Sequence, residues 1–321
     1  LKAKGGDAHM LVMSATLDTA PIARVLGDIP VITSEGRAFP VEVLYRPAPR
    51  NSRVVDQVTT VVQDALRDQA GSLLVFLPGA GEIRRVAQQL RGNLPDHVLI
   101  APLYGNLKSE QQDQAISPPP EGKRKVVLAT AIAETSLTIE GVRVVIDSGQ
   151  QRRAVFDPNS GMTRLVTGRV SKASAEQRKG RAGRVEPGIC YRLWSESEQF
   201  GLADYTPPEI LEADLAPLVL ELAQWGAREA KAVAWIDEPP AAHWRQAVTL
   251  LQWLDMLDTD GAITDHGKAA RALGIHPRLA HMVLRASAVG LGGPAAALAA
   301  LLEERDLLGP GAGADMHERV R

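Results

Sequence analysis

The sequence predicts an α/β fold, with a mainly parallel sheet domain followed by an all-helical region. Up to about residue 195, short β-branched runs alternate with amphipathic stretches, which is the pattern of strand–helix–strand units. Several runs are apolar throughout, as expected for strands covered on both faces. After a proline-rich junction near residue 200, helical periodicity replaces the strand pattern. These observations divide the chain into a sheet-containing part and a helical part.

Eight short runs are predicted as strands, and helices are predicted at 52–69 and 81–91 between them. The strands, in chain order, are 10–15 (MLVMSA), 30–33 (PVIT), 41–45 (VEVLY), 73–77 (LLVFL), 97–101 (HVLIA), 125–130 (KVVLAT), 142–147 (VRVVID) and 189–194 (ICYRLW). Parallel α/β sheets bind ligands beyond the carboxyl ends of their strands. The residues that follow 73–77, 125–130 and 142–147 are therefore the first place to expect a site.

The helical part shows leucine-rich faces at 211–225 and 243–257. An Asp-Gly turn, a short strand around Ile263 and a helix opening near Asp265 follow, and this order suggests a winged-helix domain. Two further helices are predicted over 278–293 and 294–308.

Composition excludes several classes of protein. The net charge of −2 means that any site for a polyanion must be a local patch. The single cysteine, Cys190, excludes an internal disulfide and a multi-cysteine zinc site, and its strand-like surroundings predict a buried apolar role. No apolar run approaches the ~20 residues of a membrane span, so a cytoplasmic location is expected. The chain begins at Leu1 instead of Met, and we expect a piece of a longer protein.

The stretch QRKGRAGR, residues 177–184, places four cations and two glycines in eight residues. Its arginines Arg178, Arg181 and Arg184 recur every third residue, so they share one side of a helical turn. Arginine offers a planar fork of donors that matches phosphate oxygens, and in nucleotide hydrolysis it neutralises the γ-phosphate. Gln177 is a candidate for orienting the attacking water. A solvated basic loop is the alternative interpretation.

A wider basic region surrounds this stretch. Residues 151–184 contain nine Arg or Lys residues against two acidic residues, which is the pattern of a polyanion site. Aromatic residues make up only 4% of the chain, so backbone contact is favoured over base stacking. Arg152 and Arg153 are the candidates for phosphate contact, and a solvated charged hairpin is the alternative.

Five stretches, taken together and in order, resemble motifs III, IV, IVa, V and VI of the DExH/DEAH-box superfamily-2 helicases. They are 13–16 (MSAT), 76–83 (FLPGAGEI), 102–107 (PLYGNL), 129–147 (ATAIAETSLTIEGVRVVID) and 177–184. Residues 204–210, 235–258 and 261–284 resemble the winged-helix and ratchet segments of the DEAH group. The resemblance covers essentially the whole chain and is greatest to the bacterial HrpB-type helicases.

The resemblance implies the following domains. Residues 1–35 would be the end of a first RecA-like domain and a linker, 36–200 a second RecA-like domain, 201–275 a winged-helix domain and 276–321 the start of a ratchet-like domain. The hook-turn and hairpin of the family are matched by 149–164 (GQQRRAVFDPNSGMTR).

The resemblance also implies roles for single residues. Gln177, Arg181 and Arg184 match catalytic positions that face the γ-phosphate and the water. The remaining matched positions are Ser136, Thr138 and Glu140 near the ribose and the Mg²⁺-phosphate region, Gly79 and Thr130 on the nucleic-acid backbone, and Ser14, Ala15 and Thr16, which couple hydrolysis to domain motion.

Three positions depart from the family pattern. Asp is usual where Glu140 stands, and Asn is common where Ala131 stands. An aromatic residue that stacks on adenine is expected near Pro49 and Arg50, and here the guanidinium of Arg50 is the candidate to replace it.

A P-loop requires the pattern G-x-x-x-x-G-K-[ST], which neither Gly-Lys pair of the chain satisfies, and no D-E-x-H box is present. The sequence therefore predicts the C-terminal half of an ATP-dependent helicase that acts on single-stranded or duplex nucleic acid, on RNA in preference to DNA. ATP and Mg²⁺ would be held mainly by a missing first domain, so the chain alone is not expected to hydrolyse ATP. The alternative is a non-catalytic nucleic-acid or protein-binding module.

Overall fold

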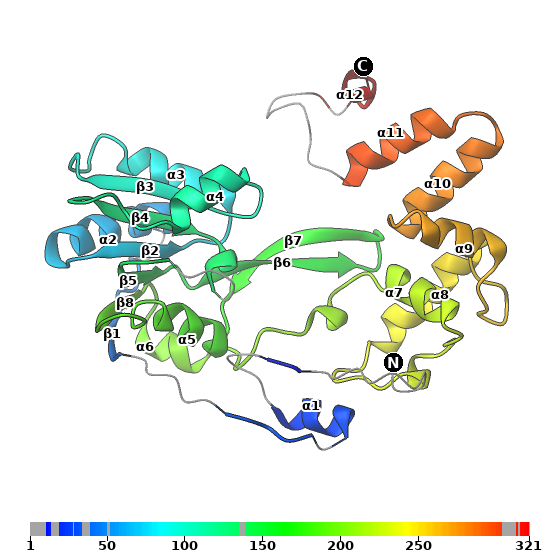
Figure 1. Cartoon of the computed structure of the whole chain (residues 1–321), viewed down its shortest axis with the longest axis horizontal. Helices are drawn as coiled ribbons and strands as arrows, with labels where there is room; N and C mark the ends of the chain where they lie inside the picture. The colour runs from blue at the N-terminus through cyan, green and yellow to red at the C-terminus, as the bar shows by residue number, and fades with distance from the viewer. Residues whose placement is uncertain are drawn as a thin grey trace. The chain divides into compact units, whose positions relative to one another are not determined.

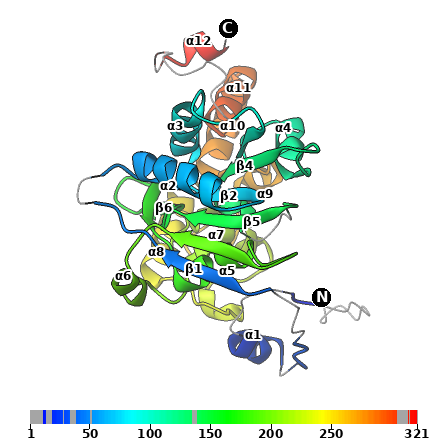
Figure 2. The ribbon, with the colours of Figure 1, turned by 90° about the vertical axis from the view of Figure 1, so that its left-hand side faces the viewer.

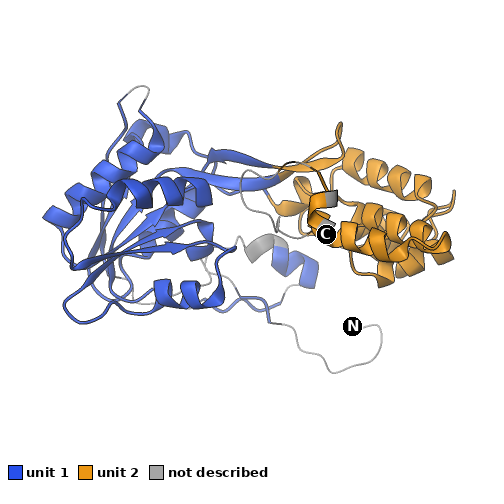
Figure 3. Cartoon of the chain, turned by 90° about the horizontal axis from the view of Figure 1, so that it is seen from above, with its two compact units in different colours: residues 1–154, 165–207 blue, residues 155–164, 208–321 orange. Residues whose placement is uncertain are grey.

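The computed structural model describes residues 11–13, 19–27, 29–33, 39–49, 52–134, 139–303, 313 and 315–320. The chain divides into two compact units (Figure 3). Unit 1 comprises 1–154 and 165–207, and unit 2 comprises 155–164 and 208–321. Each unit has a hydrophobic core of its own.

Unit 1 is built on a six-stranded sheet in which every pairing is parallel. The spatial order is β1-β8-β5-β2-β4-β3 (Figure 1). The strands are β1 (Val41–Tyr45), β2 (Ser72–Phe76), β3 (Val98–Leu103), β4 (Arg124–Ala129), β5 (Val142–Asp147) and β8 (Gly188–Arg192). Parallel sheet with flanking helices is the predicted fold class, and the arrangement is RecA-like.

Helices cover both faces of this sheet. The helices α2 (Val54–Asp68) and α3 (Ala80–Leu90) pack on one face, and α4 (Ser109–Ile116) lies on the other (Figure 2). Along β2, Leu73 and Val75 face the core under α2 and α3, whereas Leu74 and Phe76 face the opposite core. All four are buried, which explains why residues 73–76 of the strand are apolar at every position.

Six of the eight predicted strands are confirmed within one or two residues at each end. The prediction for 30–33 is wrong, because the described residues 29–33 form no strand and Ile32 is 91% exposed. A β-branched pair acquires strand structure only when a partner strand and a packed face are present. The prediction for 10–15 falls largely outside the described residues, and 11–13 are not in a strand.

A separate two-stranded ribbon consists of β6 (Gln150–Asp157) and β7 (Met162–Arg169). The base of the ribbon belongs to unit 1, and its tip at 155–164 is assigned to unit 2. The helix α5 (Lys172–Gly180) follows the ribbon and leads back to β8, and α6 (Glu196–Phe200) comes after β8. In unit 1, α1 (Thr19–Leu26) precedes the sheet.

Unit 2 is helical. Its helices are α7 (Ala216–Gln224), α8 (Ala241–Trp253), α9 (Asp265–Ala272), α10 (Pro277–Ala288), α11 (Gly292–Glu303) and α12 (His317–Val320). The predicted strand near Ile263 is reduced to one antiparallel bridge with Leu257. None of the helices in the described ranges has both the length and the apolar character needed to cross a bilayer.

Candidate functional site

Three loops meet at the carboxyl edge of the sheet in unit 1. The strand β2 lies between β4 and β5, so the residues that follow these strands are neighbours in space. Backbone hydrogen bonds join them, from the Leu77 N–H to the Ala129 oxygen at 2.8 Å and from the Ser148 N–H to the Phe76 oxygen at 3.2 Å. The structure thus forms its candidate site at the edge where parallel α/β sheets bind ligands.

The loop after β4 begins with a single 3-10 turn. Thr130 precedes the turn Ala131–Ala133, and Glu134 ends it. The Thr130 N–H donates to the Leu103 oxygen at 3.2 Å, and the Ala133 side chain is buried in the core. The turn is therefore fixed at its start and along its length, which holds Thr130 and Glu134 in a defined relation.

The helix α5 carries the basic stretch to the same edge. Ser171 caps its first turn by accepting a hydrogen bond from the Ser174 N–H at 3.1 Å. Arg178 and Lys179 occupy the last turn, where positive charge interacts favourably with the helix dipole. The helix ends at Gly180, and the three arginines then lie at different depths: Arg178 and Arg181 are buried, whereas Arg184 is exposed.

Arg178 is the most enclosed of the three, with 1% of its surface exposed. Its Nε and Nη2 lie 2.7 Å and 2.6 Å from Oε1 of Glu134, and its Nη1 lies 2.8 Å from Oδ1 of Asp147 and donates to the Gln150 oxygen at 3.2 Å. The guanidinium also stacks 4.9 Å from the centre of the Phe76 ring. Burial by itself would lower the pKa of Arg178, but Asp147 and Glu134 outweigh that effect and raise it.

Arg181 lies beside this cluster. Its side chain donates from Nη2 to the main-chain oxygen of Glu134. Burial, together with the nearby charge of Arg184, lowers the pKa of Arg181 to about 10, and Glu134 opposes that shift. The guanidinium therefore keeps its positive charge at neutral pH. Gln177 is half-buried on α5.

The ribbon places its two predicted arginines differently. Arg152 reaches the start of α3, where its Nη2 lies 3.2 Å from Oε2 of Glu82. It approaches Gly79 so closely that a Cβ at that position would lie 2.3 Å from its Nη1. Two residues predicted to contact nucleic acid, Gly79 and Arg152, are thus brought together, and Glu82 accompanies them. Arg153 is the next residue along β6, and its side chain takes the other direction.

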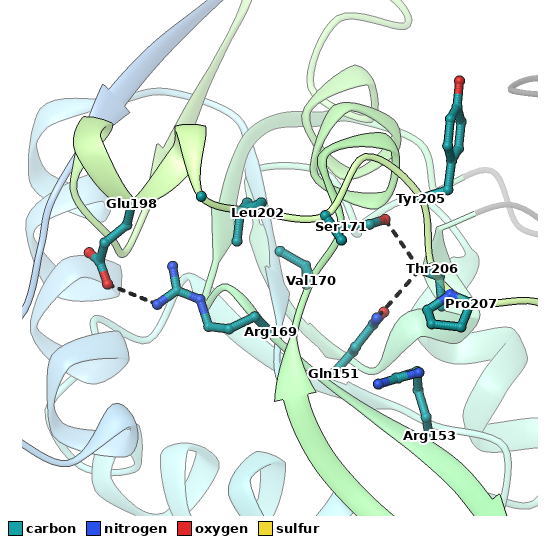
Figure 4. A pocket seen from close by; sticks show the side chains of 12 residues that line it. Gln151, Arg153, Arg169, Val170, Ser171, Glu198, Leu202, Tyr205, Thr206 and Pro207 are labelled. Carbon is teal, nitrogen blue, oxygen red and sulfur yellow. Dashed lines mark hydrogen bonds and ion pairs between the residues drawn. The ribbon is translucent and has the colours of Figure 1, made fainter. Parts of the chain in front are cut away.

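Arg153 lines a cavity of about 430 Å³ together with Gln151, Arg169 and Tyr205 (Figure 4). Val170 and Leu202 also line it, and the Thr206 hydroxyl lies 3.4 Å from Nε2 of Gln151. Because side chains alternate along a strand, Gln151 and Arg153 share this cavity while Arg152 does not. Arg152 and Arg153, both predicted to contact phosphate, therefore lie in different surroundings.

Of the other predicted site residues, Glu140 is exposed just before β5. Ser14, Ala15, Thr16, Arg50, Ser136 and Thr138 lie outside the described residues. A groove of about 530 Å³ is lined in part by Tyr45, Pro47 and Pro49, which shortly precede Arg50 in the sequence. Within the described ranges, no group of three or more His, Cys, Asp or Glu residues is placed to hold a metal ion. Cys190 is buried, as predicted, and burial raises the pKa of its thiol to about 12.

The residues at the carboxyl edge of the sheet lie within a region that is similar to known proteins. Residues 54–186, from the start of α2 to just beyond Arg184, match the family described as helicase conserved C-terminal domain. The chain is 48% identical over 303 residues to the ATP-dependent RNA helicase HrpB of Escherichia coli. Residues 54–186 thus form a helicase C-terminal domain, in a chain that is similar along most of its length to a DEAH/RHA helicase.

Solved structures agree with this assignment. Two crystal structures of E. coli HrpB, described as a DExH-box NTPase and as a DEAH/RHA helicase, match with TM-scores of 0.84 and 0.88 over 92% of this chain. The probable ATP-dependent RNA helicase DHX34 of Mus musculus is 35% identical over 309 residues. The matches to HrpB and DHX34 extend over 94% and 92% of this chain. The chain, however, spans only 37% of the length of HrpB and 27% of the length of DHX34.

Sequence reasoning missed the acidic half of the site. Glu134, Asp147 and Glu82 each pair with an arginine of the basic stretch or of the ribbon. A signal was available for two of them, because Asp147 ends an apolar strand and Glu134 closely follows another. A carboxylate at such a position is costly to bury unless it is paired with a cation.

Proposed function

We propose that this chain is the C-terminal helicase part of an ATP-dependent RNA helicase and that Gln177, Arg181 and Arg184 form its half of the ATP site. The observation that carries the proposal is the position of Arg181. It follows α5 directly and lies against the turn after β4, at the carboxyl edge of a RecA-like sheet. A buried, charged arginine at that edge suits the neutralisation of phosphate charge.

The described residues fit only part of an ATP site. Arg181 and Arg184 would stabilise the charge that develops on the γ-phosphate, and Gln177 would orient the attacking water. In the family pattern a first RecA-like domain supplies the P-loop and the Mg²⁺ ligands, and the proposal follows that division of the site. We infer that 1–35 are the end of that domain and that 36–200, 201–275 and 276–321 are the second RecA-like, winged-helix and ratchet-like domains.

Adenine is proposed to lie near Arg50, beside the groove that Tyr45, Pro47 and Pro49 help to form. Glu140, with Ser136 and Thr138, would approach the ribose and the Mg²⁺-phosphate region. Ser14, Ala15 and Thr16 would couple hydrolysis to domain motion. These roles follow the family pattern.

The nucleic-acid half of the proposal rests on Thr130, Gly79 and Arg152. All three lie on or beside the carboxyl edge, and Arg152 is drawn to Gly79. Contacts of this kind address the phosphate backbone and carry little sequence information. Arg153, on the other side of β6, would contact a different stretch of the strand. RNA is the proposed substrate because HrpB and DHX34 are named RNA helicases, and a cytoplasmic location is proposed with it.

The decisive experiment measures ATP turnover by the full-length protein with Arg181→Ala and, separately, Arg184→Ala. Loss of a transition-state arginine should lower kcat by about 10³-fold or more. Arg67→Ala is the matched control, since Arg67 is an exposed arginine on α2 whose side chain pairs with Asp64. Turnover close to wild type in both variants would refute the assignment and would indicate a binding module.

The isolated chain provides a second test. We expect weak binding to single-stranded RNA that declines as salt rises, because counterions are released from the phosphates. We also expect no ATP turnover above background. Robust hydrolysis by the isolated chain would contradict the division of the ATP site between two domains.

A further inference from the structure

We propose that Glu134 and Arg178 are positioning residues, a buried strut that transmits nucleic-acid contact at Thr130 to the catalytic Arg181. The inference rests on the proposed function and adds a coupling element to it. Neither residue is assigned a contact with ATP or with nucleic acid.

Arg178 is unsuited to contact a phosphate. Only 1% of its surface is exposed, although it belongs to the same basic stretch as Arg181 and Arg184. Its guanidinium is held on one side by Glu134 and on another by Asp147, which is completely buried. An arginine committed to two internal carboxylates stabilises the arrangement of the protein around it and has no free face for a ligand.

Glu134 is contacted at two different atoms by the two arginines. Its carboxylate binds Arg178, whereas its main-chain oxygen accepts a hydrogen bond from Arg181. Any shift of Glu134 therefore changes the position of Arg181 and the strut at the same time. Arg178 in the last turn of α5 and Arg181 just after the helix are in this way both tied to one residue of the loop after β4.

The charges of the cluster reinforce this dependence. Glu134 and Asp147 bring two carboxylates to the single guanidinium of Arg178, and Oδ2 of Asp147 is buried with no hydrogen-bond partner among the described residues. Arg181 supplies the second positive charge. If Arg181 moves toward a phosphate, the cluster is left with excess negative charge, so its movement depends on how Glu134 is held.

The other end of the connection is Thr130. One 3-10 turn separates Thr130 from Glu134, and the Glu134 N–H donates to the Ala131 oxygen at 2.9 Å. Because the turn is hydrogen-bonded and its Ala133 is packed in the core, it has little freedom to absorb a displacement at Thr130 before it reaches Glu134. A nucleic-acid strand that displaces Thr130 would therefore displace Glu134 and, through its main-chain oxygen, Arg181.

The test compares ATP turnover of the full-length protein with and without single-stranded RNA in the Glu134→Gln variant. Glutamine keeps the shape and an acceptor for Arg178 but removes the charge. We expect the stimulation by RNA to fall about fivefold or more, the scale of a typical coupling between sites. The KM for ATP and the Kd for RNA should each change by less than the stimulation does. The matched control is Glu186→Gln, which removes a half-exposed carboxylate that pairs with Arg143 in the same unit.

A second variant helps to separate a loss of coupling from a loss of folding. Arg178→Lys keeps the positive charge but loses the fork that joins Glu134 to Asp147, and it should also lower stimulation. Thermal unfolding of both variants shows whether the measurements compare folded proteins. A purely stabilising role predicts lower melting temperatures with normal stimulation.

Normal RNA stimulation in folded Glu134→Gln and Arg178→Lys would overturn the inference, and so would an equal loss in Glu186→Gln. These outcomes are distinct from failure of the proposed function, which is read from Arg181→Ala and Arg184→Ala. If those arginine variants lose turnover while the strut variants keep full stimulation, the proposed function stands and the strut does not.

Discussion

The basic stretch at the end of α5 and the β6–β7 ribbon are both rich in arginine, yet the structure treats their charges differently. In the basic stretch, Arg178 in the last turn of α5 is buried between two carboxylates, whereas Arg184, six residues later, is exposed. On the ribbon, Arg152 and Arg153 are consecutive but lie in different surroundings. Positive charge alone therefore does not assign a residue to a ligand.

The backbone explains the difference. A helix that ends within the basic stretch carries residues three apart from the core to the surface, so the depth of each arginine changes along the chain. A strand sends successive side chains to opposite faces, so adjacent arginines separate completely.

The largest expected effect is the loss of stability on replacing Arg178. Arg178→Met leaves Glu134 and Asp147 without their cation, and breaking a buried pair in this way should lower the free energy of unfolding by about 3–5 kcal/mol. Arg184→Met changes an exposed residue and should stay within about 0.5 kcal/mol. Urea unfolding of the isolated chain measures both. Equal losses would show that the two arginines do not differ as their depths indicate.

The two glycines of the basic stretch provide the next contrast. A Cβ at Gly183 would lie 2.5 Å from the Phe39 oxygen and 2.7 Å from Cγ2 of Val41, so Gly183→Ala should cost about 1–3 kcal/mol. Nothing lies within 4 Å of a Cβ at Gly180, and alanine is the better helix former, so Gly180→Ala should be neutral or slightly stabilising. Thermal unfolding distinguishes them. A destabilised Gly180→Ala would contradict the open space seen beside it.

The sheet could be predicted from sequence because burial on both faces leaves an uninterrupted apolar run, as at 73–76 in β2 and 126–129 in β4. The strands of the ribbon have no such signal, since β7 is exposed along almost its entire length, and only the resemblance to a family indicated a hairpin there. The arginines proposed to be catalytic were predicted from their motif. Their depth was not, because it depends on where α5 ends and on Glu134, which lies 44 residues before Arg178 in the sequence.

Substitutions in the ribbon are expected to have a smaller effect, which is on the binding of RNA. Arg152 lies beside Gly79, so Arg152→Ala should weaken binding of single-stranded RNA and reduce the slope of log K against log salt by about 0.7, the value for one phosphate contact. Arg153→Ala should change the slope less, because Arg153 faces the cavity with Gln151 and Tyr205. Salt titrations with the isolated chain measure both. If Arg153→Ala reduced the slope as much as Arg152→Ala does, both arginines would contact phosphate although their side chains leave opposite faces of β6.

The smallest expected effect concerns the ion pair of Arg169 with Glu198 at the base of the ribbon, 2.8 Å long and about half exposed on both sides. The Ser195 N–H, helped by Arg169 and the Ser195 hydroxyl, lowers the pKa of Glu198 from 4.5 to about 2. A carboxylate whose pKa is lowered in the folded protein contributes stability above pH 4.5. That contribution is lost as the pH falls toward about 2. Because solvent screens the pair, we expect less than about 1 kcal/mol. Urea unfolding between pH 5 and pH 3 should show a shallower loss in Glu198→Gln than in wild type, and parallel curves would show that this exposed pair contributes nothing measurable, unlike the buried pairs of Arg178.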